Sequence, residues 1–489
     1  MNLQILIVIL YFAITMALGV LASRKTKSSD SFLGSGMGVF AIVCVACGQW
    51  LGGTATTGCA EYGFTSGISG WWYTIANGAG MLMMGLFFAS RYRKYDTVTI
   101  PGIIEKVVGP KSRTVCSILL IFVMLAVGLS QMIAAGKLGE SLLGIDFTIS
   151  CFVFAIIFIV YTMSGGMDSV EATNKLHIGV MYFGMILAVI LAIVACGGWD
   201  GFKGGLDAID ARDGTKHFSM MGVGISKVSS WIIASILSAG AAQASIQPVL
   251  AAKNPATAKK ACLISVLVVV PFGFFTTMLG MASRVMSENG ALLNAAGVNV
   301  TDPKLAFTTL IMNFSPVVSG IILASILAAV LSTVSPIILA AATMFTKDLY
   351  EKKIRPGASD KELVRSSRIA TAISGVICCF AAIALVNSSA VLDLVYAAYT
   401  LRGVLFIVIL FGMYWKYTSE KGVCLSVLIT FVICVSYVAA KLVIGQYPIV
   451  IGNFAVSETY VGVIVACICI VVLSKIFKQT ELEKAAKAG

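Results

Sequence analysis

The sequence predicts an all-α polytopic membrane protein, and three observations support this fold class. Of the 489 residues, 58% are hydrophobic and 12% are charged, whereas soluble domains carry about 25% charged residues. Apolar runs of about 20 residues, the length that crosses a bilayer as a helix, recur along the whole chain. Basic residues form short clusters between these runs, as cytoplasmic loops do, so the net charge of +12 does not indicate a nucleic-acid partner.

Thirteen such runs are predicted to span the membrane. They lie at residues 3–22, 37–63, 69–90, 114–136, 148–166, 171–196, 227–249, 260–282, 316–346, 368–387, 390–414, 422–442 and 457–476. An odd number of spans places the two chain ends on opposite sides of the bilayer. Because most Lys and Arg residues follow the odd-numbered runs, the positive-inside rule predicts a multi-pass plasma-membrane protein with an outside N-terminus and a cytoplasmic C-terminus.

The second run is unusual because glycines interrupt it. Its central part, residues 41–62, reads AIVCVACGQWLGGTATTGCAEY. Glycine costs about 1 kcal/mol in a helix interior relative to alanine, and a backbone break at membrane depth is tolerated where it lines a cavity. Such a break offers carbonyl oxygens to a cation. The alternative is an unbroken helix that uses small residues to pack closely against its neighbours.

The seventh run is interrupted too. Residues 229–250 read SSWIIASILSAGAAQASIQPVL, with a central glycine and a proline near the cytoplasmic end. Two broken runs, five spans apart and oppositely directed, predict two inverted repeats around a central site. The predicted division is a peripheral helix with a cytoplasmic loop (1–36), the first repeat (37–196), an extracellular loop (197–226), the second repeat (227–415), two peripheral helices (416–476) and a cytoplasmic tail (477–489).

The ninth run carries a polar face within an apolar segment. Ala329, Ser332 and Thr333 are spaced i, i+3 and i+4, so a carbonyl and two hydroxyls converge on one side of a helix. Uncharged oxygens suit a weakly bound monovalent cation, whereas a calcium site needs carboxylates. The alternative is that both hydroxyls bond to the preceding turn of their own helix.

The motifs of other function classes do not occur in the sequence. There is no Walker A motif, so transport driven by ATP is not expected. The apolar runs contain no nucleophile–base pair or metal cluster, so we predict neither an enzyme nor a cofactor.

Two segments resemble one family of transporters. SILAAVLSTVSPIILAAATMFTKDLYEK in the ninth run and YTMSGGMDSVEATNKL before the sixth resemble the signatures of the sodium:solute symporter family, and the similarity covers nearly the whole chain. The run WLGG at residues 50–53 and ASDKELVRSSRI most resemble the branch that contains the high-affinity choline transporters. The resemblance implies 13 helices, a 5+5 inverted-repeat (LeuT-like) core with broken helices 2 and 7, and coupling of inward sodium flow to solute uptake. It also implies a sodium site built from backbone carbonyls of Ala46, Gln49 and Ala329 with the hydroxyls of Ser332 and Thr333.

The sequence departs from the family pattern after the fifth run. Where the family has an aspartate near the ion site, this chain has Asn174, followed by Lys175. The missing carboxylate argues against a second sodium site. It also allows a sodium-independent exchanger or proton symporter in which the Lys175 ammonium takes the ion's place, although a lysine at this depth more often extends to water.

The solute site is predicted around the broken runs. Trp50 matches one wall of the choline branch's aromatic cage, but the other walls fall on Val127 and Ala242, which argues against choline. Arg402 lies within an apolar run, where arginine normally faces a cavity or a partner. It can bind a solute carboxylate or pair with Asp393 or helix-end carbonyls. The predicted solute-binding residues are Trp50, Gly53, Gln131, Ser238, Ala242, Gln243, Tyr399 and Arg402.

These expectations combine into one function. The sequence predicts a monomeric, sodium-coupled symporter that imports a small polar or zwitterionic solute by alternating access, with sodium as coupling ion and the lipid bilayer as its surroundings. Besides the sodium-independent transporter, a transporter-like sensor is a further alternative.

Overall fold

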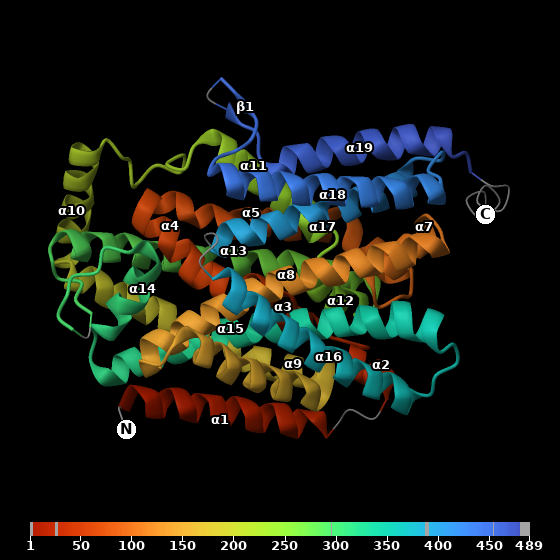
Figure 1. Ribbon diagram of the computed structural model, residues 1–489. Coiled ribbons are helices and arrows are strands. Elements are labelled where there is room, and N and C mark those ends of the chain that lie inside the picture. The colour runs from red at the N-terminus through yellow and green to blue at the C-terminus, as the bar shows by residue number, and fades with distance from the viewer. Residues whose placement is uncertain (1–2, 25–27, 295, 387–390, 453, 480–489) are drawn as a thin grey trace.

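The computed structural model describes residues 3–24, 28–294, 296–386, 391–452 and 454–479. Within these ranges the chain is almost wholly helical, and the long helices lie side by side in one bundle (Figure 1). The strands in these ranges are β1 (Val450–Ile451) and β2 (Phe454–Ala455), which form one short antiparallel pair. The predicted all-α class is therefore confirmed.

The helices follow the apolar runs of the sequence. In chain order they are α1 (Leu3–Ser23), α2 (Ser29–Leu33), α3 (Val39–Trp50), η1 (Thr54–Gly58), α4 (Cys59–Ser66), η2 (Gly67–Trp71), α5 (Trp72–Met83), η3 (Met84–Phe88), α6 (Ala89–Lys94), α7 (Ile100–Val107), α8 (Pro110–Leu143), α9 (Phe147–Ala195), α10 (Gly198–Asp213), α11 (Ile225–Ala239), α12 (Gln243–Leu250), α13 (Pro255–Glu288), α14 (Pro303–Met312), α15 (Pro316–Met344), η4 (Phe345–Ile354), α16 (Asp360–Leu385), α17 (Val391–Tyr414), α18 (Glu420–Ile444) and α19 (Glu458–Ile476).

Ten helices within the described ranges are long and apolar enough to cross a membrane, and eleven if the bent pair Val39–Trp50 and Thr54–Lys94 is one span. The predicted count of thirteen separates that pair into two spans and adds one at 148–166, where Phe147–Val160 is a shorter apolar helix. Thirteen therefore stays a prediction. The start of α1 and the end of α19 lie at opposite ends of the bundle (Figure 1), which fits an odd number of crossings.

Both interrupted runs are broken in the structure. The first breaks after α3, and the segment that follows is bent by 58°. The second breaks between α11 and α12, where Gly240 lies so close to α17 that a side chain there would meet the Phe406 ring at 2.1 Å. The prediction of two broken helices at these places is confirmed, whereas the division into two repeats stays a prediction.

The predicted connection between the fifth and sixth runs is wrong in its length. Instead of a loop at 167–170, a single non-helical residue, Gly166 with φ 56° and ψ −137°, divides α9 into two helices. That left-handed conformation favours glycine. A Cβ there would also approach the Phe32 carbonyl oxygen at 2.3 Å, so the kink lets α2 pack directly on α9.

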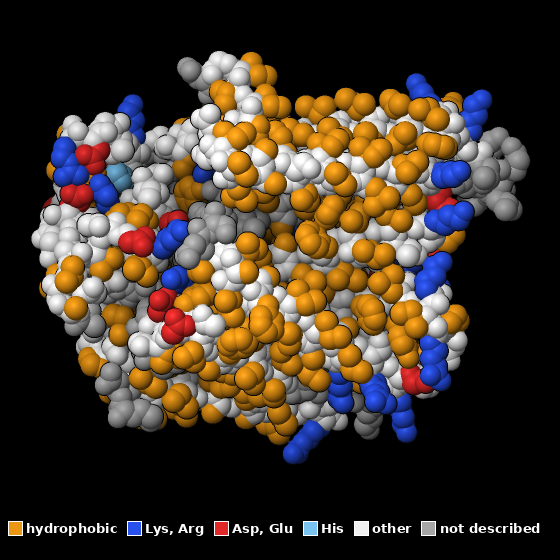
Figure 2. Space-filling model, viewed as in Figure 1, with side chains coloured by type: hydrophobic (Ala, Val, Ile, Leu, Met, Phe, Trp, Pro, Cys, Tyr) orange, Lys and Arg blue, Asp and Glu red, His pale blue; other side chains and the backbone are white. Residues whose placement is uncertain are grey.

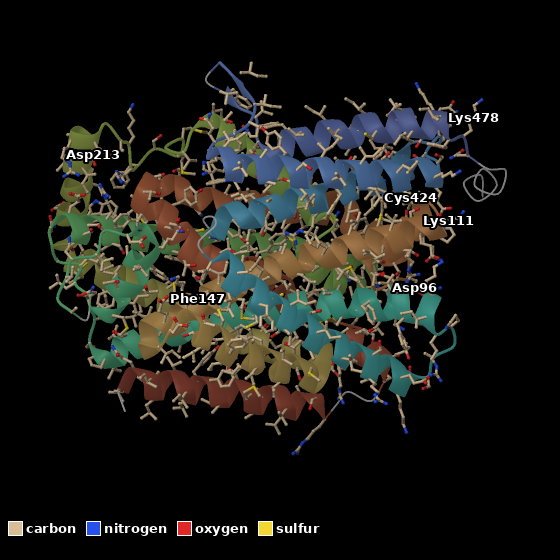
Figure 3. All side chains as sticks on the ribbon, in the orientation of Figure 1. Asp96, Lys111, Phe147, Asp213, Cys424 and Lys478 are labelled. Carbon is tan, nitrogen blue, oxygen red and sulfur yellow. The ribbon has the colours of Figure 1, made fainter. Side chains whose placement is uncertain are left out.

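The two ends of the bundle differ in charge. Figure 2 shows hydrophobic side chains over the flank, Lys and Arg with few Asp and Glu at one end, and Lys and Arg mixed with Asp and Glu at the opposite end. Lys111 and Lys478 lie at that basic end, whereas Asp213 of α10 lies at the opposite one (Figure 3). The segment 197–226, predicted as a loop, contains α10, and the connection between α13 and α15 contains α14. The predicted tail beyond residue 479 lies outside the described residues.

Candidate ion and solute site

Helix α15 brings the predicted ion ligands together. The Ser332 hydroxyl donates to the Ala329 carbonyl at 2.8 Å, and the Thr333 hydroxyl donates to the same oxygen at 3.0 Å. The Thr333 hydroxyl also lies 2.5 Å from the carbonyl oxygen of Gly48 in α3. We call these four oxygens, from Gly48, Ala329, Ser332 and Thr333, the ion cluster. Because all four are neutral and buried, they suit a monovalent cation.

Glycine allows α3 and α15 to approach this closely. A Cβ on Gly48 would lie 2.7 Å from the Ser332 carbonyl oxygen, and one on Gly52 would lie 2.2 Å from the Thr333 hydroxyl. Helix α3 ends at Trp50, so the carbonyls of its last turn lose regular helical partners. The break is thus what makes the Gly48 carbonyl available to Thr333.

Ala46 and Gln49 are buried near the end of α3, and both contact a residue of another helix. The Ser245 hydroxyl of α12 lies 3.3 Å from the Ala46 carbonyl oxygen and 2.5 Å from Gln49 Oε1. Helix α12 begins directly after the second break. A hydroxyl therefore joins the two broken helices beside the ion cluster, and sequence reasoning missed Ser245.

Asn174 and Lys175 are placed very differently. The Asn174 amide is buried and lies 3.4 Å from the Cys44 carbonyl oxygen and 3.3 Å from that of Ser332, so it joins α3 to α15. The Lys175 side chain is 39% exposed and pairs with Glu171 at 2.6 Å. The idea that the Lys175 ammonium takes the ion's place does not fit this position, because the side chain points to the protein surface.

Two of the predicted solute residues have structural partners. Gln131 accepts from the Gly53 amide at 2.7 Å and donates to the Thr54 hydroxyl at 3.0 Å. Its side chain thus provides an acceptor for a backbone N–H group at the first break. Gln243 accepts from the Ile100 amide at 2.7 Å and donates to the Val98 carbonyl at 2.9 Å. The amide of Gln243 is thus directed to the backbone at the start of α7.

An aromatic cluster surrounds Arg402 on α17. The guanidinium carbon lies 4.2 Å from the Tyr399 ring centroid and 5.5 Å from that of Trp50. The Tyr399 hydroxyl is 2.9 Å from that of Tyr73 on α5, which the sequence did not single out. We call Trp50, Tyr73, Tyr399 and Arg402 the arginine cluster. Its members are all buried. Because Trp50 is the last residue of α3, the arginine cluster lies next to the first break.

The second break lies on the same face of α17. Tyr399, Arg402 and Phe406 are spaced i, i+3 and i+7, and Phe406 packs against Gly240. Ser238 and Ala242 flank that break, and the Ser238 hydroxyl is buried without a hydrogen-bond partner among the described residues. The structure therefore gathers Trp50, Gly53, Ser238, Ala242, Tyr399 and Arg402 around the two breaks.

A bundle with two broken helices, neutral oxygen ligands at one break and buried polar groups around both has the architecture of a secondary active transporter. The family model "Sodium:solute symporter family" matches residues 32–430. The chain belongs to this family. Its members are transporters, so the prediction that the chain is not an enzyme is confirmed.

Individual relatives agree with this assignment. The osmoregulated proline transporter OpuE of Bacillus subtilis is 28% identical, covering 96% of this chain and 95% of its own length. The sodium/glucose cotransporter of Vibrio parahaemolyticus is 25% identical, covering 87% of this chain and 83% of its own. A solved structure of a Na+-coupled sialic acid symporter in an outward-open state superposes with a TM-score of 0.78 at 18% identity, covering 98% of both chains, and shows the common fold. None of these three relatives is described as a choline transporter, so that finer resemblance stays a prediction.

The Gly52→Ala substitution tests the close approach at the ion cluster. The new methyl group would lie 2.2 Å from the Thr333 hydroxyl and 2.5 Å from Gln131 Oε1, so one of them must move. We expect sodium-dependent uptake in proteoliposomes to fall roughly tenfold or more, since each 1.4 kcal/mol lost from binding is a factor of ten. Gly179→Ala is the matched control, because no atom lies within 4 Å of its Cβ position. Equal uptake by the two variants contradicts the prediction.

Proposed function

We propose that this protein imports a small polar or zwitterionic organic solute together with sodium, across the plasma membrane and by alternating access. The observation that carries the proposal is the contact between Thr333 and Gly48, which joins α15 to the end of the broken α3 through oxygen atoms alone. A cation bound there holds these two helices together. No enzyme-like or ATP-driven step is required.

The ion site we propose consists of the backbone carbonyls of Ala46, Gln49 and Ala329 with the hydroxyls of Ser332 and Thr333. The arrangement around Ala329 supports this set, and the Gly48 carbonyl is a further oxygen at hydrogen-bond distance from Thr333. In the structure each hydroxyl donates its proton to a carbonyl. Binding of sodium requires the hydroxyls to rotate so that their lone pairs face the ion.

The solute site we propose lies next to the ion site, around Trp50, Gly53, Ser238, Ala242 and Tyr399. Trp50 follows Gln49 directly at the end of α3, so any movement of this helix end changes both sites. Sodium and solute that favour the same conformer raise each other's affinity by the same factor. That shared helix end is the physical basis of coupling.

The orientation of the protein follows from its charge. We propose that the basic end of the bundle, which carries Lys111 and Lys478, faces the cytoplasm and that α10 and α14 lie outside (Figure 3). We also propose that a single chain is the transporting unit, since both broken helices and the ion cluster come from one chain.

Uptake into proteoliposomes tests the proposal. We expect a sodium gradient to drive accumulation of a transported metabolite, with L-proline as the first probe because a proline transporter is among the relatives, followed by small organic acids. Replacement of sodium by potassium on both sides should abolish accumulation. Accumulation that continues without sodium, or that requires a proton gradient instead, contradicts sodium coupling.

A further inference from the structure

Arg402 has no acidic partner in the part of the chain that the structure describes. The side chain is fully buried, its guanidinium nitrogens form no hydrogen bond of regular geometry, and the Tyr399 side chain is a polar group within reach. Asp393, whose side chain lies outside the described residues, is nine residues earlier on the same continuous helix. Nine residues of α-helix correspond to roughly 13.5 Å of rise and to opposite faces. This backbone separation counts against the predicted pairing of Arg402 with Asp393, which stays a prediction.

The surrounding rings compensate the charge only partly. Tyr399 and Trp50 present their rings to the guanidinium at 4.2 and 5.5 Å. A desolvated cation–π contact offsets only part of the cost of removing a charge from water. Arginine stays protonated at any physiological pH. The difference favours binding of an anion against Arg402.

Further buried polar atoms near the cluster lack hydrogen bonds of regular geometry. Trp50 Nε1 meets no hydrogen-bond partner within the described ranges, and the Asn77 amide on α5 has the Tyr399 side chain within reach but forms no hydrogen bond of regular geometry. Asn77 lies beside Tyr399, so it belongs to the same site. Buried polar groups are normally satisfied, and a group of unsatisfied ones calls for a missing binding partner.

We propose that the solute carries a carboxylate, which the Arg402 guanidinium binds with additional hydrogen bonds from Trp50 Nε1 and the Asn77 amide. This inference rests on the proposed transport function and names the solute class of that site. Guanidinium and carboxylate match as a two-pronged pair. Arg402 forms no ion pair with a described acidic side chain, so its charge is available to a solute carboxylate. The Arg402 guanidinium also occupies the ring faces that a quaternary ammonium would need, which is a second reason against choline.

Thermal unfolding of the solute-free protein in nanodiscs tests whether Arg402 is uncompensated. We expect Arg402→Met to raise Tm, because it removes a buried charge that has no acidic partner among the described residues. Arg113→Met is the matched control: Arg113 is paired with Asp348 at 2.6 Å, so the same exchange should lower Tm. A fall in Tm for Arg402→Met as large as that for Arg113→Met assigns Arg402 a structural role and overturns the proposal.

Ligand binding gives the second readout. Wild-type protein in sodium chloride is heated with acetate, lactate, pyruvate, benzoate and proline, and with the corresponding amides. A ligand that binds the folded state raises Tm. We expect at least one carboxylate to raise Tm by about 2 °C or more, its amide to have no effect, and Arg402→Met to abolish the shift. An amide that stabilises as well as its acid, a shift that persists in Arg402→Met, or no shift with any acid overturns the carboxylate assignment.

The same measurement in potassium chloride separates this inference from the proposed function. A carboxylate shift that survives replacement of sodium by potassium contradicts sodium coupling and leaves the assignment of Arg402 intact. A sodium-dependent shift of equal size for acids and amides supports sodium coupling and contradicts the assignment of Arg402.

Discussion

The Ser332→Ala/Thr333→Ala double variant is expected to lose sodium affinity on the order of 100-fold. Each alanine removes one hydroxyl of the ion cluster, and interactions of a charged partner with a neutral group contribute roughly 1.5–3 kcal/mol each. At the lower end of that range two lost ligands cost about 3 kcal/mol, which is about two powers of ten in binding. The sodium concentration that gives half-maximal uptake in proteoliposomes measures the effect.

Ser325→Ala is the matched control for that double variant. Ser325 lies two turns earlier on α15, and its hydroxyl also joins two helices, at 2.9 Å from the Val180 carbonyl oxygen of α9. Removing this hydroxyl should leave the half-maximal sodium concentration unchanged. A double variant whose sodium dependence equals that of Ser325→Ala contradicts the position of the ion site.

The part of the ion cluster that lies on α15 was predictable because its geometry is local, whereas the Gly48 carbonyl of α3 was not predicted. Ala329, Ser332 and Thr333 share a helix face by spacing alone, and glycines within the second run mark the break that meets them. Ser245 and Asn77 could not be found this way, because a single serine or asparagine within an apolar run has no distinctive pattern. Their roles depend on how α12 and α5 pack against α3 and α17.

The direction of a side chain was the least predictable feature of the site. Asn174 and Lys175 are neighbours in sequence, yet one joins α3 to α15 and the other pairs with Glu171 at the surface. Adjacent helical residues point about 100° apart, so only the position of the neighbouring helices decides which of them faces the site. Gln243 illustrates the same limit, since its amide binds the backbone before α7.

Helix content was also underestimated in polar segments. The segment 197–226 is rich in glycine and aspartate, which disfavour helix, but α10 forms there. Lys203 pairs with Asp207 at 2.6 Å in the i, i+4 spacing that stabilises helices. Packing of Phe202 and Leu206, both buried, contributes further, and this contact could not be read from composition.

Asp348 holds several helices together at the basic end of the bundle. Asp348, in η4, has a fully buried side chain and accepts from Arg113 of α8 at 2.8 and 2.6 Å. It also accepts at 2.8 Å from the hydroxyl of Thr99, which caps α7. One carboxylate of η4 thus binds Arg113 and Thr99, which lie 235 and 249 residues earlier in the sequence.

We therefore expect Asp348→Ala to lower the free energy of unfolding by about 3–5 kcal/mol, the range for breaking one side of a buried ion pair. Glu105→Gln is the control, because Glu105 binds the same arginine but is 26% exposed, and partly exposed pairs contribute about 0–1 kcal/mol. Asp348→Leu/Arg113→Met should cost less than Asp348→Ala, since no unpaired charge remains. Denaturant titration of the three variants in bicelles measures these differences, and a loss below 1 kcal/mol for Asp348→Ala means that α7, α8 and η4 are held together without this carboxylate.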